Sequence, residues 1–185
     1  MRRGLAALVS AVLVTAPAMA ETACPAPGAM QPASGRLPFV QTRHLSNIAE
    51  PIGSSGYVDI SDAEVVWTVL DPIEVRTVIS DAGILQAVED GPLEPVSSAG
   101  VANPMVSESG LIDLLKGNFA AVSTYYDVEE VPASGSAGWR IRLHPKNAGV
   151  AEYLTGINLT GCRSIETVEI VQSNGDVMNI GFGTE

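Results

Sequence analysis

Short runs of alternating apolar and polar residues follow one another through most of the chain. Side chains alternate across a β-strand, so EVVWTVL at 64–70 predicts a strand with Val65, Trp67 and Val69 on one face. Pro, Gly, Asp and Ser separate the runs at spacings too short for parallel crossovers, which favours an antiparallel meander. The expected strands lie at 39–46, 51–60, 64–70, 75–80, 84–89, 125–131, 139–144, 151–160, 165–172 and 176–182.

The second of these runs, PIGSSGYVDI at 51–60, has an unusual face. Its Ile52, Ser54, Gly56, Val58 and Ile60 share one side, which is apolar at the ends and nearly bare in the middle. Gly inside a strand marks a bend, a bulge or a close approach. The strand therefore either curves over an ordinary core or helps to form a concavity.

One segment, SESGLIDLLKGNF at 107–119, has the period of an amphipathic helix, with Gly117 as its stop and a loop at 91–104 before it. One short helix cannot cover a long antiparallel sheet, and such a sheet curls, closes or splits into two layers. We therefore expect a mainly β (α+β) fold. A closed barrel and a sandwich would bury the inner face completely, whereas a half-open barrel with a partial helical lid would leave an apolar trough.

The N-terminal residues have the pattern of a secretory signal peptide. Two arginines precede an apolar run at 5–14 and the small-residue ending Ala18-Met19-Ala20, so we expect residues 1–20 to be removed after Ala20. The apolar run is too short to span a bilayer. Residues 21–38 are rich in Pro, Gly, Ala and Ser and should form an extended arm without regular structure. A single domain is expected at 39–185, in an exported protein that does not span the membrane.

The mature chain is strongly acidic. The whole chain has a net charge of −11, and loss of Arg2 and Arg3 with the signal peptide makes it −13. Nucleic acid and anionic membrane surfaces would repel such a protein.

Two cysteines, Cys24 and Cys162, are present in the whole chain. An oxidising compartment permits one bridge between them, which would tie the arm to the C-terminal sheet. The alternative is two buried free thiols.

Residues typical of catalysis or metal binding form no recognisable pattern. His44 and His144 lie on half-polar strands with no nucleophile or zinc motif around them. We interpret Glu129 and Glu130 as solvated residues of a strand. Asp59 and Asp62 have the same interpretation, as solvated residues of a strand and the turn after it. We therefore expect no enzyme activity, no cofactor and no metal site. The apolar strand faces are compatible both with a packed core and with an acyl-binding trough, and their pattern does not separate the two.

A series of motifs, taken in order, resembles the LolA-like lipoprotein carriers of Gram-negative periplasms from Phe39 to the C-terminus. The matching segments are FVQTRHL, PIGSSGYVDI, EVVWTVLDP, VRTVISDAGI, LIDLLKGNF and WRIRLHP. They provide Phe39 and Gln41, Gly56, Trp67 with Pro72, Ile79 to Gly83, Leu114 with Leu115, and Trp139 to Pro145. Two departures indicate a divergent member with a smaller lid: residues 21–38 cannot form the leading amphipathic helix, and the stretch ISDAEVVW at 60–67, which ends at Trp67, has no arginine.

The resemblance implies an unclosed, curved antiparallel half-barrel with a small helical lid over an apolar cavity. It implies a non-catalytic periplasmic carrier or chaperone that shields an acylated lipoprotein or lipid cargo. An inner-membrane exporter would be the donor and an outer-membrane protein the acceptor. The rival interpretation is a periplasmic adaptor or sensor that binds a protein partner through the half-barrel. The residues expected to line the lipid-binding cavity are Phe39, Val58, Trp67, Val69, Leu114, Leu115, Trp139, Ile141 and Leu143.

Overall fold

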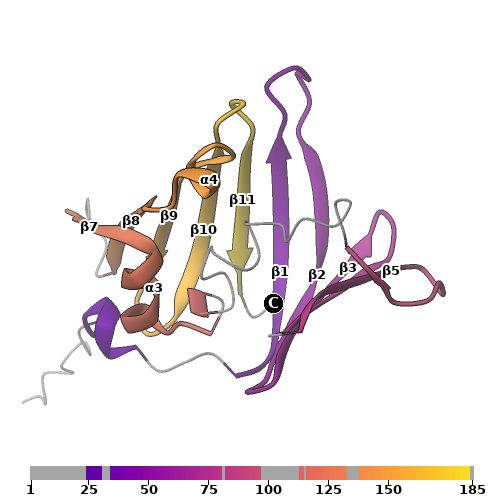
Figure 1. Ribbon diagram of the computed structural model, residues 1–185, viewed down its shortest axis with the longest axis horizontal. Helices are drawn as coiled ribbons and strands as arrows, with labels where there is room; N and C mark the ends of the chain where they lie inside the picture. Colours follow the sequence, from indigo (N-terminus) through magenta and orange to yellow (C-terminus); the bar gives the residue numbers. More distant parts are fainter. Residues whose placement is uncertain are drawn as a thin grey trace, which may run out of the picture.

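In the described part of the chain, eleven strands form one antiparallel sheet in the computed structural model of the protein (Figure 1). The structure describes residues 24–30, 34–80, 82–96, 113–114, 116–132 and 138–183. The strands are β1 (Gly35–His44), β2 (Ile52–Ile60), β3 (Glu64–Asp71), β4 (Val75–Ser80), β5 (Gly83–Val88), β6 (Glu94–Pro95), β7 (Tyr126–Val131), β8 (Trp139–Pro145), β9 (Leu154–Gly161), β10 (Ile165–Gln172) and β11 (Val177–Phe182). The helices are η1 (Pro27–Ala29), α3 (Phe119–Tyr125) and α4 (Ala148–Ala151).

The sheet is open. Its strand order is β6-β5-β4-β3-β2-β1-β11-β10-β9-β8-β7, so β1 lies in the middle and the edges are β6 and β7. In Figure 1 the two halves of the sheet splay apart on either side of β1 and β11, and η1 and α3 lie beside each other on the β7–β10 side. The predicted fold class is confirmed: a mainly β protein whose curved antiparallel sheet does not close into a barrel.

Strand β1 begins earlier than predicted. The expectation of an arm without regular structure is wrong at 27–29, which form η1, and at 35–38, which belong to β1. Leu37 pairs with Val58 of β2 and packs against the core. The carbonyl of Pro38 accepts a hydrogen bond from Gly183 N–H, which lies past the end of β11. The missing N–H of Pro38 faces the same side, so the strand tolerates a proline at this position.

The helices differ most from the sequence prediction. Helix α3 was not predicted. The strand expected at 151–160 begins later, at Leu154, because Ala151 belongs to α4. The side chains of Asn118 and Asn147 cap the two helices by accepting from Ala121 N–H and Val150 N–H. Residues 107–112 and 115 of the predicted helix lie outside the described residues, while 113–114 are helical. Within the expected loop at 91–104, β6 occupies 94–95. Of the described helices, none is long and apolar enough to cross a membrane.

The bare face of β2 is explained by a bulge. The register between β2 and β3 shifts between Ser55 and Gly56. A Cβ atom at Gly56 would collide with the backbone carbonyl oxygen of Thr68, so no side chain fits where β3 approaches. Beyond the bulge, Val58 and Ile60 are buried on the inner face. The strand thus bends and presents its apolar end to the concave side of the sheet.

Asp176 joins the β10–β11 turn to the end of β1. Its carboxylate accepts from Ser46 N–H at 2.9 Å and pairs with Arg43 at 3.3 Å, and the side chain is 8% exposed. The Ser46 N–H bond is the main reason that the pKa of Asp176 lies below its ordinary value. Because the folded-state pKa is depressed, this stabilisation is present above the unfolded value, about 3.9, and is lost as pH falls through the folded one.

We predict that Asp176→Asn lowers the thermal midpoint at neutral pH by about 2–4 °C, because the amide keeps the shape but loses the charge. Wild type loses the same advantage as its carboxylate is protonated, so the two midpoints should converge below about pH 4. Calorimetric scans of both proteins at several pH values measure the gap. A gap that stays constant with pH would show that the charge of Asp176 does not contribute.

Candidate functional site

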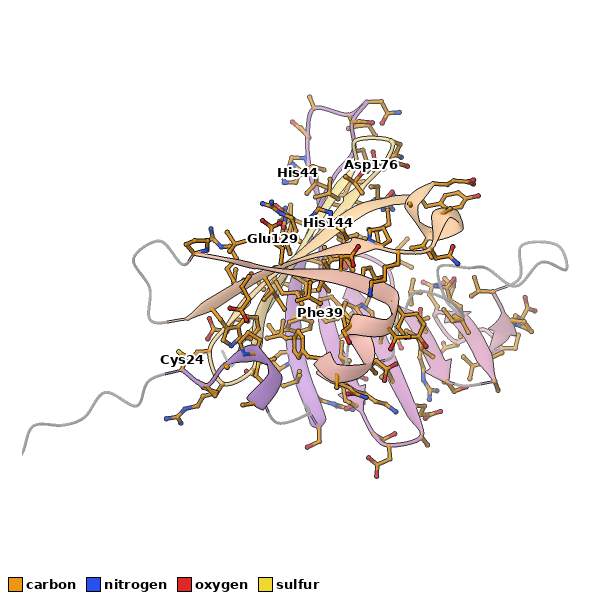
Figure 2. The ribbon with its side chains drawn as sticks, turned by 60° about the vertical axis from the view of Figure 1, so that its left-hand side comes forward. Cys24, Phe39, His44, Glu129, His144 and Asp176 are labelled. Atoms are coloured by element: carbon orange, nitrogen blue, oxygen red, sulfur yellow. A yellow bond between two sulfur atoms is a disulfide. The ribbon has the colours of Figure 1, made fainter. Side chains whose placement is uncertain are left out.

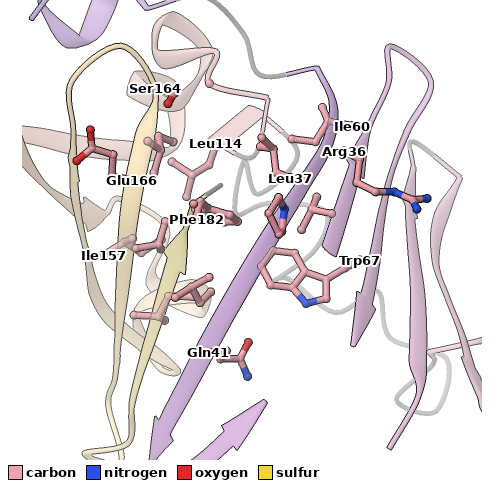
Figure 3. A pocket seen from close by; sticks show the side chains of 18 of the residues that line it. Arg36, Leu37, Gln41, Ile60, Trp67, Leu114, Ile157, Ser164, Glu166 and Phe182 are labelled. Atoms are coloured by element: carbon pink, nitrogen blue, oxygen red, sulfur yellow. The ribbon is translucent and has the colours of Figure 1, made fainter. Parts of the chain in front are cut away.

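A cavity of about 630 Å³ lies on the concave face of the sheet. Its walls come from both halves: β1 to β4 on one side and β9 to β11 on the other, with Met30, Leu114 and Gly117 at one end. The volume is in the range of small-molecule sites, roughly 300–1,000 Å³. Figure 3 shows Leu37, Ile157, Leu114 and Phe182 pointing into the same space.

Strand alternation produces the apolar lining. On β10 and β11, Ile170 lies opposite Met178 and Val168 opposite Ile180, and all four face the cavity. The intervening Glu169 and Asn179 point to the other face of the sheet. The wall is therefore an uninterrupted apolar surface that the period of the strands dictates.

Trp67 is the largest side chain of the lining. Its ring centroid lies 4.4 Å from that of Phe39 and 6.2 Å from that of Phe182, the second contact being edge-to-face. Phe39 is 3% exposed and lies behind the indole, in the interior of the sheet in Figure 2. These contacts fix the indole, so its exposed surface forms a rigid part of the wall (Figure 3).

Few polar groups reach the cavity. Besides Arg36, the polar residues of the lining are Ser34, Gln41, Thr77, Ser164 and Glu166. Arg36 also borders it, but both of its guanidinium bonds go to Asp59 at 2.8 Å, and the group lies 3.9 Å from the centroid of the Tyr57 ring. Figure 3 shows the guanidinium directed away from the cavity. This exposed pair raises the pKa of Arg36 and lowers that of Asp59 through their hydrogen bonds.

The described residues bring no catalytic set together at the cavity. His144 lies 3.6 Å from Glu129 on the β7–β8 face opposite the core, and His44 is exposed at the end of β1. Within the described residues, no group of three or more His, Cys, Asp or Glu is placed to hold a metal ion. The apolar lining of the cavity is suited to binding an apolar molecule.

The N-terminal arm contributes to the lining of the cavity. Cys24 and Cys162 form a disulfide across a sequence separation of 138, which confirms the predicted bridge. Met30 is 9% exposed and contributes to the lining. Figure 2 shows Cys24 next to η1, at the start of this arm. The bridge thus holds the arm at the β9–β10 connection, as the sequence led us to expect.

Of the residues predicted to line a lipid site, Val58, Trp67 and Leu114 line the cavity. Leu115 lies outside the described residues. The structure places the other five away from the lining, in the core or packed against it: Phe39, Val69, Trp139, Ile141 and Leu143.

The unpredicted helix α3 accounts for part of this difference. Its Phe119 packs edge-to-face on Trp139 with centroids 6.1 Å apart, and its Val122 is fully buried in the same core. Ile141 and Leu143 of β8 are 1% and 0% exposed. Ile141 and Leu143 of β8 therefore face inward, as predicted, but other side chains cover them.

Sequence reasoning missed much of the lining on the C-terminal strands. Val168 and Ile170 share one face of β10 by alternation, but whether that face lines a cavity depends on the neighbouring strands. Ile60 lies on the same strand face as Val58, so alternation alone could have predicted it as a lining residue. The lining residues that were not predicted include Leu37, Ile60, Ile79, Ile157, Met178 and Ile180.

Comparison with known proteins gives a family and several solved structures at low identity. Residues 28–183 match the family model described as "Outer membrane lipoprotein carrier protein LolA-like". Among curated proteins, none matches the chain. Similar solved structures include a LolA superfamily protein from Nitrosomonas europaea, at 8% identity and a TM-score of 0.46, with 85% of this chain and 88% of that chain covered. An outer membrane lipoprotein-sorting protein domain from Vibrio parahaemolyticus matches at 8% identity and a TM-score of 0.41, with 85% and 87% covered.

Proposed function

The chain belongs to the LolA-like family of outer membrane lipoprotein carrier proteins, and from this premise we propose that it is a non-catalytic periplasmic carrier that shields an acyl-bearing cargo. The cargo is a lipoprotein or a lipid in transit from the inner to the outer membrane. The observation that carries the proposal is the apolar cavity of about 630 Å³ on the concave face of an unclosed sheet.

The physical basis is transfer of acyl chains out of water. Each methylene buried in the cavity contributes about 0.8 kcal/mol. The aliphatic wall of Val168, Ile170, Met178 and Ile180 provides a surface with no polar group to be left unpaired. A carrier must also release its cargo, so we expect moderate affinity.

Export and transfer partners complete the proposal. Residues 1–20 act as a signal peptide cleaved after Ala20, which delivers the protein to the periplasm. An inner-membrane exporter loads the cargo and an outer-membrane acceptor receives it. The acidic surface of the mature chain suits docking to basic patches on such proteins.

Native mass spectrometry tests the carrier proposal. The exported protein is purified from a diderm host without detergent, and bound material is extracted into organic solvent and identified. We expect a stoichiometric lipid or lipopeptide adduct that is lost in Ile170→Glu, which places a carboxylate in the cavity wall. A protein free of lipid that also fails to take up fatty-acyl probes would contradict the proposal, and capture of a soluble protein partner would then favour an adaptor.

A further inference from the structure

The arm at residues 24–30 forms one boundary of the cavity. It starts at the disulfide and reaches Met30, whose side chain is nearly buried and contributes to the lining. Pro25 and Pro27 restrict the backbone between these two points. The arm is therefore a short, stiff strap whose far end moves little while Cys24 is fixed.

The disulfide fixes one end of this strap, and at its other end the chain continues into β1, which begins at Gly35. Among the described residues, the backbone hydrogen bonds of 24–30 stay within the arm: Ala29 N–H to Ala26 O at 2.8 Å and Met30 N–H to Pro27 O at 3.3 Å. In the described part of the chain, η1 packs on α3 and Met30 lies at the cavity. A segment held by so few contacts opens readily once its covalent bond is lost.

The other end of the bridge is fixed at the cavity. Cys162 N–H donates to Ser164 O at 3.2 Å, and Trp139 Nε1 donates to Cys162 O at 2.7 Å. Ser164 and Glu166 also line the cavity, directly after this point. The bond therefore connects a rigid corner of the cavity to the strap that covers it.

We propose that the Cys24–Cys162 disulfide is a redox latch, which holds Met30 over one end of the cavity and slows the exchange of acyl cargo. The proposal rests on the carrier function proposed above. A dithiol reductant breaks the S–S bond, gives two cysteine thiols and is itself oxidised to a disulfide. The freed strap then leaves the cavity open at that end.

The opening itself is measured without any ligand. The chain has two tryptophans, so Trp139→Phe leaves Trp67 of the cavity wall as the only indole. This variant loses the hydrogen bond to Cys162 O but keeps the disulfide, so its own oxidised and reduced forms are compared. Quenching of Trp67 fluorescence by acrylamide is expected to rise roughly twofold on reduction, because opening of the strap admits the quencher. Circular dichroism of the same samples checks that the sheet remains folded.

Cargo exchange is measured with a neutral fluorescent fatty-acyl ester. Release is expected to be roughly tenfold faster after reduction, a change comparable to losing the burial of one Met side chain. Met30→Ala keeps the disulfide but removes the side chain at the cavity, so it should release faster even when oxidised. Leu143→Ala, a core change outside the lining, is the control for general destabilisation and should release like wild type.

The outcomes separate this proposal from the carrier proposal. Unchanged quenching of Trp67 and unchanged release in the reduced, folded protein would overturn the latch. If the reduced protein unfolds, Met30→Ala decides, and release at the wild-type rate would overturn it equally. If no acyl probe binds, the carrier function fails, and the quenching of Trp67 still shows whether the disulfide holds the strap closed.

Discussion

Replacement of both cysteines, in Cys24→Ser/Cys162→Ser, is expected to lower the free energy of unfolding by roughly 5 kcal/mol. The bridge joins residues separated by 138 positions, so its loss frees nearly the whole unfolded chain from a covalent loop. In the chain-entropy model, this gain in unfolded-state freedom is the main effect. Native domains have about 5–15 kcal/mol in total, so the variant should be close to the limit of folding.

Urea unfolding followed by circular dichroism at low temperature measures the loss. Reductant supplies the matched control: it should bring wild type toward the double variant and leave the double variant itself unchanged. A loss below about 1 kcal/mol would mean that the bridge does not constrain the unfolded chain as the loop model requires.

The strands were predictable because one local signal, period 2, specifies them. Strand β10 was predicted at its observed bounds, 165–172, from alternation and from the turns at its ends. Strand β1 was predicted to start late because residues 21–38 are rich in Pro, Gly, Ala and Ser, whereas the missing N–H of Pro38 faces a position past the end of β11. The position where β11 ends opposite Pro38 cannot be predicted from the sequence of β1 alone.

Helix α3 shows the opposite case. Its sequence FAAVSTY is short and contains Val, Thr and aromatic residues, which favour strands. The helix forms because Asn118 caps it and Val122 is buried in the core. The Asn was a usable signal, but the packing that outweighs propensity comes from residues far away in the chain.

At the candidate site, too, the sequence predicts which side chains face inward but not which of them line the cavity. Alternation showed that Ile141 and Leu143 face inward, and by the same pattern Ile157 and Ile170 face inward too. Only the curvature of the sheet and the position of α3 decide that the first pair is covered and the second lines the cavity. The family resemblance indicated that a cavity exists, whereas its walls needed the three-dimensional register.

Ile170→Glu is expected to weaken binding of a neutral acyl ester roughly hundredfold. Ile170 is half-buried, lines the cavity, and lies opposite the apolar Met178 and Ile157 on the neighbouring strands. A carboxylate there either keeps water in the cavity or loses its hydration to an acyl chain, and an unpaired buried charge costs several kcal/mol. Two powers of ten correspond to about 2.8 kcal/mol, well within that cost.

The controls separate charge in the cavity from charge on the protein. Val40→Glu changes the sheet's other face, where Val40 is 65% exposed, and should bind like wild type. Burial raises the pKa of a carboxyl at position 170, so binding by Ile170→Glu should recover as pH falls and the neutral acid forms. Fluorescence titration across pH measures both effects. Equal affinities of Ile170→Glu and Val40→Glu at neutral pH would mean that acyl chains do not occupy this cavity, because only the first charge faces it.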